Sequence, residues 1–240
     1  MKATHLTMKK LSIIIPCYNE KNHIPLILSH FAAVIETRPI EVILVNNGST
    51  DGSEKIFNEI CSHFPFVRSV YVPINQGYGY GILQGLKAAT GDYLGWTHAD
   101  MQTDPQDVIK AFDIVASKSF PQNIFVKGNR KGRSLFDRFF TVGMSYFETV
   151  YLHKWLWDIN AQPNIFHRSF FEKWQNPPHD FSLDLYALYM AKKYNLTVMR
   201  FPVQFSQRIH GASSWNTGLQ AKWKFIKRTI NFSCSLKTGL

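Results

Sequence analysis

The first part of the chain alternates between short hydrophobic segments and longer amphipathic ones, and this alternation restricts the chain to few folds. The short segments are rich in β-branched or aromatic residues and are closed by turn residues, which predicts strands at 11–16, 40–46, 67–72 and 92–98. The longer segments predict helices at 22–37, 51–64 and 77–90. Strands joined by helices of this length form right-handed βαβ units, so the fold class is α/β, with a mostly parallel central sheet flanked by helices.

The remainder of the chain is less regular. It predicts strands at 123–129 and 164–168, and one strand or a bent pair of strands at 196–205. It predicts helices at 134–156 and 181–194 and a basic helix at 217–232. No internal repeat, low-complexity tract or Pro/Gly-rich linker divides the sequence. We therefore expect one domain over residues 1–240, a length that is ample for one large core.

Charge is distributed unevenly along the chain. The formal net charge is +10, and no Asp or Glu follows Asp184. Such asymmetry indicates an anionic partner: nucleic acid, a phosphorylated substrate or an acidic membrane face. A nucleic-acid-binding module is disfavoured, because no recognition-helix or RNA-stacking motif accompanies the charge.

No segment predicts secretion or a membrane span. The basic start is followed by only a short apolar run before Pro16, and a run of roughly 18 apolar residues, the length of a span, does not occur. Cys17, Cys61 and Cys234 show no pairing pattern, which is typical of a reducing compartment. We expect a cytoplasmic protein, either free or peripheral at the cytoplasmic membrane face.

Polar clusters follow three of the predicted strands: PCYNE (16–20), NNGSTDG (46–52) and HADMQTDP (98–105). Ligands bind at the carboxyl ends of parallel strands, so the clusters mark one edge of the sheet as the site. In the first cluster a tyrosine ring suits stacking on a base, and a carboxylate suits ribose hydroxyls. Each of the first two clusters is also compatible with an ordinary turn, and Asp51 has the capping-box spacing to Glu54.

Two common nucleotide fingerprints are absent from the sequence. GYGYG (77–81) opens a helix after the third predicted strand rather than the first, which does not match the dinucleotide motif. A G-x-x-x-x-G-K-[ST] loop does not occur. A different kind of phosphate site is therefore needed.

The third cluster carries the most chemistry. His98, Asp100 and Gln102 occupy alternate positions of the predicted strand tip, which would direct them to one side. An imidazole, a carboxylate and an amide oxygen can share Mg²⁺ or Mn²⁺ with substrate phosphates. Asp104 followed by Pro105 has the pattern of a helix cap and first helical residue.

These clusters resemble successive blocks of the inverting family-2 glycosyltransferases, above all of the dolichyl-phosphate mannosyltransferase and polyprenyl-phosphate sugar transferase branch. The matching blocks are IIIPCYNE, ILVNNGSTDGS, NQGYGYGILQGLKAATGDYLGWTHADMQTDP, VKGNRKGRS, DINAQPNIFHRSFFEKW and DFSLDLYALYMAKKYNLTVMRFPVQFSQRIHGASSW, in this order over about 11–215. The resemblance implies a GT-A fold with a Rossmann-like sheet. It divides the chain into a nucleotide-binding half (about 11–104), an acceptor-side half (about 105–215) and a basic amphipathic helix (about 217–232).

The resemblance also implies roles for individual residues. It assigns the binding of a divalent metal ion, Mn²⁺ or Mg²⁺, to His98, Asp100 and Gln102. It places Arg130 and Arg208 near the phosphates and Asp184 near the acceptor, and we group these three as catalytic candidates. The implied nucleotide-binding residues are Pro16, Tyr18, Glu20, Asn46, Asn47, His98, Ala99 and Asp100.

The sequence departs from the family pattern at two places. His98 stands where the family has the first Asp of its metal motif, and imidazole suits Mg²⁺ less well than an oxygen ligand does. Asn46 and Asn47 stand where the family has paired acids. An amide both donates and accepts, so it suits uracil, whereas the adjacent donors of guanine favour a carboxylate. A UDP-sugar donor is therefore favoured over a GDP-sugar.

The predicted function is inverting, metal-dependent transfer of a sugar from a nucleotide-diphosphate sugar to a lipid-linked or glycan acceptor. Asp184 is the candidate base for a hydroxyl acceptor, or alternatively a surface acid of its helix. Trp223, Ile226 and Ile230, with lysines around them, have the pattern of an interfacial helix, as does the aromatic segment 135–157; burial against the sheet is the alternative for both. A non-catalytic nucleotide-sugar-binding homologue remains the alternative function.

Overall fold

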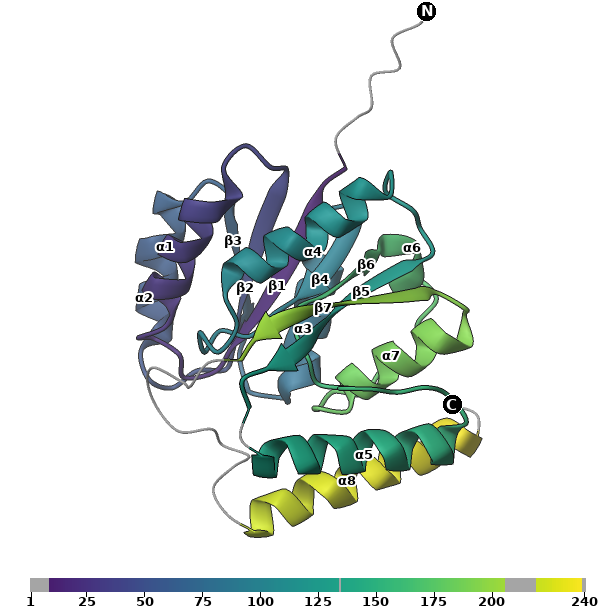
Figure 1. Ribbon diagram of the computed structural model, residues 1–240. Coiled ribbons are helices and arrows are strands. Elements are labelled where there is room, and N and C mark those ends of the chain that lie inside the picture. The colour runs from purple at the N-terminus through teal and green to yellow at the C-terminus, as the bar shows by residue number, and fades with distance from the viewer. Residues whose placement is uncertain (1–8, 134, 206–218, 239–240) are drawn as a thin grey trace, which may run out of the picture.

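The computed structural model describes residues 9–133, 135–205 and 219–238, and its centre is a seven-stranded sheet with helices on both faces (Figure 1). The strand order is β3-β2-β1-β4-β6-β5-β7, and β6 runs antiparallel to both of its neighbours while the other pairs are parallel. The strands are β1 (Leu11–Cys17), β2 (Ile40–Asn47), β3 (Val67–Val72), β4 (Tyr93–Trp96), β5 (Ile124–Lys131), β6 (Asn164–His167) and β7 (Thr197–Gln204). The predicted α/β class with a mostly parallel sheet is confirmed.

Helices connect these strands along the described chain. They are α1 (Ile24–Ile35), α2 (Ser53–Ile60) with the 3-10 turn η1 (Cys61–His63), α3 (Tyr78–Ala88), α4 (Pro105–Ser117), α5 (Leu135–Leu152), α6 (Arg168–Phe171), α7 (Leu183–Lys193) and α8 (Leu219–Thr238). Most follow the predicted segments. The short α6 had no predicted counterpart, because one helical turn is too brief to show a periodic pattern.

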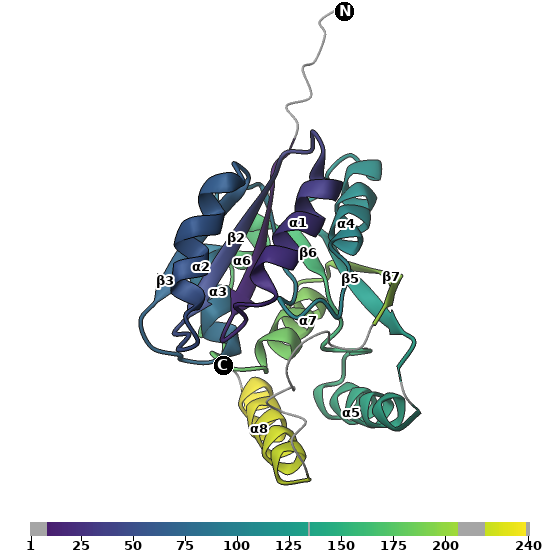
Figure 2. The same cartoon turned by 90° about the vertical axis from the view of Figure 1, so that its left-hand side faces the viewer.

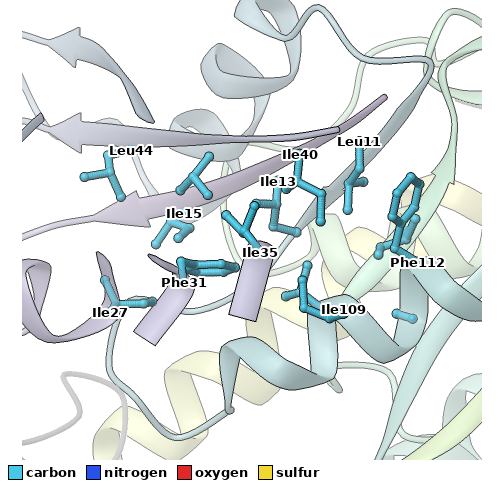
Figure 3. Close-up of a cluster of buried hydrophobic side chains, with 14 of the residues drawn as sticks. Leu11, Ile13, Ile15, Ile27, Phe31, Ile35, Ile40, Leu44, Ile109 and Phe112 are labelled. Atoms are coloured by element: carbon cyan, nitrogen blue, oxygen red, sulfur yellow. The ribbon is translucent and has the colours of Figure 1, made fainter. Parts of the chain in front are cut away.

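The sheet is buried on both faces, which explains why β1 and β2 are nearly continuous apolar runs in the sequence. In β1, Ile13 and Ile15 pack toward α1 and α4 (Figure 3), whereas Ile14 packs on the other face, in the cluster that includes α3 and α7. Full burial of such a side chain stabilises the fold by roughly 1.5–3 kcal/mol. Because the strands are packed on both faces, their carboxyl ends are rigid. The loops that follow therefore start from fixed positions.

Helices α5 and α8 form a separate layer beyond the carboxyl edge of the sheet (Figures 1 and 2). They contact each other through a polar pair, in which Ser233 Oγ donates to Glu148 Oε2 at 2.7 Å. Glu148 is fully buried, and burial raises the pKa of its carboxyl to about 7. Within the described residues, none of the helices combines the length and hydropathy that crossing a bilayer requires.

Two local predictions differ from the structure. β4 ends at Trp96, before the predicted residue 98. Helix α2 begins at Ser53 with Gly52 as its N-cap, so Asp51 is not the cap residue. The left-handed conformation of Gly52 (φ 85°), which glycine adopts readily, places one more residue between Asp51 and the helix. By contrast, Asp104 accepts from the Gln106 N–H at 2.8 Å and α4 begins at Pro105, as predicted.

Candidate functional site

A cleft of about 620 Å³ opens at the carboxyl edge of the sheet. Loops after β1, β2, β4 and β5 form its walls, together with parts of α3, α5 and α7. This volume is in the range of small-molecule sites. The sequence-predicted residues that line the cleft are Pro16, Tyr18, Glu20, Asn47, His98, Ala99, Asp100, Gln102, Arg130 and Asp184.

The loop after β1 presents a ring and a carboxylate to the cleft. Tyr18 is 47% exposed, so its ring is accessible to a flat ligand. Glu20 is paired with the buried His23, with 2.6 Å between Oε2 and Nδ1. Asn19, in a left-handed conformation, accepts from the Thr50 N–H at 2.8 Å, and this bond joins the loop after β1 to the loop after β2.

The two asparagines at the end of β2 face opposite ways, because consecutive residues of a strand alternate in direction. Asn47 lines the cleft and its Nδ2 donates to the Gly77 carbonyl at 2.9 Å. Asn46 is buried without lining the cleft, and its Oδ1 accepts from the Ser49 N–H at 3.0 Å. The structure therefore brings Asn47 to the predicted nucleotide site and gives Asn46 a place in the turn.

Asp51 also lies in the cleft, although the sequence indicated only a capping role for it. Its Oδ1 accepts from Ser53 and its Oδ2 from the Lys21 N–H at 3.1 Å. Burial acts to raise the pKa of this carboxyl, but the hydrogen bonds from Ser53 and Lys21 lower it overall. An ionised carboxylate thus stands beside Asn47 at the end of the cleft formed by β1 and β2.

The segment after β4 brings His98, Asp100 and Gln102 to the cleft by a turn rather than by strand alternation. The strand has already ended, and Met101 has a left-handed conformation (φ 59°). Asp100 Oδ1 accepts from the Gln102 N–H at 3.2 Å, which closes the turn. The predicted juxtaposition is observed, but its physical cause was predicted wrongly.

This turn suits a divalent ion only in part. Within the described part of the chain, no group of three or more His, Cys, Asp or Glu could hold a metal by itself. Asp100 supplies one carboxylate, and Gln102 and His98 supply an amide oxygen and an imidazole. Mg²⁺ and Mn²⁺ are commonly bound by one or two carboxylates plus substrate phosphates, so this donor set fits an ion that is bound jointly with a diphosphate.

Two arginine side chains, at and just after the end of β5, place positive charge in the cleft. Arg130 lines the cleft while its Nε donates to Asp158 Oδ1 at 2.8 Å, and its backbone N–H donates to Asp158 Oδ2 at 2.8 Å. Arg133, which the sequence reasoning did not single out, also lines the cleft and donates to Thr141 Oγ1. Arg208 lies outside the described residues.

Asp184 is buried at the start of α7 and reaches the cleft, so the alternative of a helix-surface acid is wrong. Its Oδ1 accepts from Gln162 Nε2 at 3.0 Å and from the indole Nε1 of Trp96 and Nδ2 of Asn164, each at 3.2 Å. Burial raises the pKa of this carboxyl, and the charge of Lys127 opposes that rise. Near it, Tyr78 stacks on Phe181 with ring centroids 4.6 Å apart.

The polar residues that surround Asp184 and Arg130 were missed by the sequence reasoning. Asp158 and Gln162 lie in DINAQPN, a block that was matched as a whole without roles for its members. Lys127 directly follows the apolar run 124–126 of β5 and is fully buried. A charged residue within a strand that is expected to be buried is a signal that could have identified Lys127.

The sheet order, its single antiparallel strand and a cleft at the strand ends define the GT-A class of nucleotide-sugar transferase folds. Solved structures of glycosyltransferases share this fold over nearly the whole chain. One is glucosyl-3-phosphoglycerate synthase from Mycobacterium tuberculosis with Mn²⁺, UDP and phosphoglyceric acid, with a TM-score of 0.73 and 18% identity, covering 97% of this chain and 79% of that one. Another is the Pyrobaculum calidifontis mannosyltransferase with GDP-Man and Mn²⁺, with a TM-score of 0.65 and 18% identity, covering 92% and 61%.

The chain belongs to glycosyl transferase family 2, whose model matches residues 12–174. Its relatives include undecaprenyl-phosphate 4-deoxy-4-formamido-L-arabinose transferases. That of Pectobacterium atrosepticum is 32% identical over 135 residues, which cover 55% of this chain and 40% of the relative. That of Yersinia enterocolitica is 32% identical over 105 residues, covering 42% and 32%. The match thus spans about a third to two-fifths of these relatives' length, and the predicted family, GT-A fold and enzyme class are confirmed.

Proposed function

We propose that the protein transfers a sugar from a nucleotide-diphosphate sugar to a polyprenyl phosphate, with inversion at the anomeric carbon. The observation that carries the proposal is that one cleft is lined by Tyr18, Asn47 and Asp100 together with the cations Arg130 and Arg133. A ring for the base, an amide for its edge, a carboxylate for an ion and cations for phosphates are the groups that such a donor needs. The undecaprenyl-phosphate sugar transferases among the relatives support the acceptor class.

In this proposal the donor lies along the edge formed by β1, β2 and β4. Tyr18 stacks on the base and Asn47 pairs with it, which favours UDP over GDP. Asp100, Gln102 and His98 would hold a divalent ion, Mn²⁺ or Mg²⁺, against the diphosphate. When bound, such an ion neutralises the negative charge that develops on the departing diphosphate. Arg130 and Arg133 add positive charge at the same place, and Arg208 is the further candidate from the sequence.

The acceptor would reach the cleft past α5. Phe140 and Thr141 line the cleft, whereas the side of α5 away from it carries exposed apolar side chains at helical spacing. These side chains are Leu135 (84% exposed), Phe139 (79%), Val142 (39%), Tyr146 (73%) and Val150 (55%), and we call them the α5 stripe. The exposed alternative is therefore observed for this helix rather than burial against the sheet.

We infer that the α5 stripe contacts the surface of an anionic bilayer. Two further aromatic side chains are exposed, Trp155 after α5 and Trp223 on α8, at 68% and 69%. Arg138, Lys227 and Lys237 are exposed on α5 and α8, and the formal net charge of +10 favours an acidic partner. Apolar side chains flanked by cations are typical of helices that lie in a membrane interface. A polyprenyl phosphate in that bilayer would present its headgroup beside the cleft.

Attack by the acceptor phosphate on the face opposite the leaving diphosphate inverts the anomeric centre. A phosphate is already ionised at neutral pH, so this acceptor needs no general base. A sugar hydroxyl would need one, and Asp184 is the carboxylate available for that role. Asp184→Asn therefore separates the two acceptor classes, because it leaves the transfer to phosphate far less impaired than the transfer to a hydroxyl.

The test is a transfer assay in vesicles that contain undecaprenyl phosphate, with Mn²⁺ and either UDP-sugars or GDP-mannose. The expected result is nucleotide release that requires the lipid and matches the glycolipid formed. Calorimetric binding of UDP without turnover of any donor would instead favour the non-catalytic nucleotide-sugar-binding alternative. Transfer to a glycan but not to the lipid would overturn the acceptor assignment alone.

A further inference from the structure

Four buried polar side chains form one hydrogen-bonded group that reaches the cleft at Asp184. Lys127 and Asn164 are fully buried, and Gln162 and Asp184 are 1% and 2% exposed. The sheet register brings two of them together, because Asn164 of β6 pairs with Lys127 of β5 on one side and with Trp96 of β4 on the other. A buried lysine is costly unless hydrogen bonds satisfy it, so its partners matter.

The hydrogen bonds of these residues form a directed chain. Lys127 Nζ donates to Asn164 Oδ1 at 2.6 Å and to the Ala161 carbonyl at 2.7 Å. Asn164 Nδ2 then donates to Gln162 Oε1 at 2.7 Å and to Asp184 Oδ1 at 3.2 Å. Gln162 Nε2 donates to Asp184 Oδ1 at 3.0 Å. Apart from the bond to Ala161, every bond thus leads from the lysine toward the carboxylate.

Lys127 determines this direction. A primary ammonium only donates, so the side-chain amide of Asn164 must turn its oxygen toward Nζ. Its NH₂ group then faces Gln162 and Asp184, and the same logic orients the Gln162 amide. Burial lowers the pKa of Lys127 to about 7, yet a neutral amine still has two N–H groups for its two acceptors. The observed direction is therefore compatible with both protonation states, but only the ammonium form enforces it, because the neutral amine also has an acceptor lone pair.

Reversal of the Asn164 amide would be unfavourable at every contact. Its NH₂ group would face the donor Nζ, and its oxygen would face Gln162 Oε1 and the Asp184 carboxylate. Buried polar groups left without a partner cost about 1–3 kcal/mol each, so the observed direction is strongly preferred. An apolar residue at 127 would remove the donor that orients the Asn164 amide. The Asn164 oxygen would then lose its hydrogen bond from Nζ.

We propose that Lys127 is a positioning residue, which orients the Asn164 and Gln162 amides so that they hold Asp184 Oδ1 and fix the carboxylate at the cleft. The inference rests on the proposed function to the extent that Asp184 acts on a substrate there. Its structural part, the orientation of the two amides by Lys127, holds independently of any substrate.

The first test follows the amides themselves in the 240-residue protein without substrate. Nitrogen-15 NMR of the side-chain NH₂ groups of Asn164 and Gln162 should show slow hydrogen exchange in the wild type. Lys127→Met, which keeps the apolar stem and removes the donor, should speed this exchange at least tenfold. Lys127→Gln, a neutral donor, should retain most of the protection. Lys118→Met, an exposed lysine after α4, is the matched control and should change nothing. Unchanged protection in Lys127→Met would overturn the inference.

The second test uses the transfer assay with UDP-sugar, Mn²⁺ and undecaprenyl phosphate vesicles. Lys127→Met should lower kcat by no more than Asp184→Asn does, with the donor KM within twofold, and Lys127→Gln should recover most of that loss. In an Asp184→Asn background, Lys127→Met should cause little further loss, because both changes act on one group. An equal loss in both backgrounds would mark a merely structural role and overturn the inference. An inactive wild type with protected amides would count against the proposed function instead.

Discussion

The two sides of the cleft are built in different ways. On the β1–β2 side, short polar residues at strand ends bond to each other across adjacent loops, as Asn19 does with Thr50. On the β5–β6 side, the polar groups lie inside the sheet, as Lys127 and Asn164 do. The first arrangement follows from local turns on a rigid platform. The second requires strands that are distant in sequence to meet in register.

The difference has a consequence for how each side tolerates change. Exposed residues of these loops, such as Asn19 and Thr50, can be replaced without leaving a buried polar group unpaired, since water reaches them. Removal of one member of a buried chain leaves its partners unsatisfied. We expect substitutions on the first side to change ligand affinity, and substitutions on the second side to change rate and stability together.

Asp100→Ala, in the turn after β4, should have the largest effect of these substitutions. Loss of the only carboxylate at the turn after β4 should lower metal-dependent transfer at least ~100-fold, since the charge of the departing diphosphate would be poorly neutralised. Nucleotide release with and without Mn²⁺ measures this effect. Asp104→Ala is the matched control: it removes the α4 cap, which costs about 1 kcal/mol of stability, and leaves the rate unchanged. Equal rates for the wild type and Asp100→Ala would contradict the metal role.

The α5 stripe is tested by the double substitution Phe139→Asp with Tyr146→Asp. Two charged residues in an interfacial face should weaken binding to anionic vesicles by about tenfold or more. Flotation of the protein with vesicles measures binding, and calorimetry with UDP should show an intact donor site. Tyr71→Asp, an exposed tyrosine of the edge strand β3, should leave flotation unaltered. Flotation of the double variant at the wild-type level would refute the assignment.

The buried Lys127 on the β5–β6 side of the cleft predicts a pH dependence of stability. Lys127 has a pKa of about 7 in the folded protein, whereas an unfolded lysine titrates near pH ~10.4. Between these values the unfolded state binds more protons, so wild-type stability should rise with pH relative to Lys127→Met. The gain should reach about 1 kcal/mol or more from pH 7 to pH 10, measured by urea unfolding. A constant difference across this range would show that the lysine is not depressed in pKa.

The smallest expected effect concerns the nucleobase. Asn47→Asp removes a donor and adds a second acceptor, so the affinity ratio of UDP to GDP should fall about threefold. Asn46→Asp provides the comparison, since Asn46 is the neighbouring residue and does not line the cleft. Competition binding of the two nucleotides measures the ratio. A shift caused by Asn46→Asp and not by Asn47→Asp would reverse the placement of the two amides.

The sequence predicted the first side of the cleft well because its determinants are local. Strand alternation with helices located the ends of β1, β2 and β4, and therefore Tyr18, Asn47 and Asp100. The direction of each side chain was harder to predict: Asn46 faces away, and the turn at Met101 replaces a strand. On the second side the sequence indicated Arg130 and Asp184 but not Lys127 and Gln162. Lys127 reaches Asp184 through Asn164 of β6, a four-residue strand whose antiparallel insertion has no local signature.

The insertion of β6 between β4 and β5 also limits how this part of the gene can change in length. Asn164 faces Trp96 and Lys127 in one cross-strand row. One additional residue before Asn164 would turn its side chain to the opposite face of the sheet, although the backbone could still pair. The loop between α6 and α7, by contrast, could lengthen at its exposed positions. Insertions and deletions among natural variants should therefore be frequent around residues 172–177 and nearly absent from 161–167.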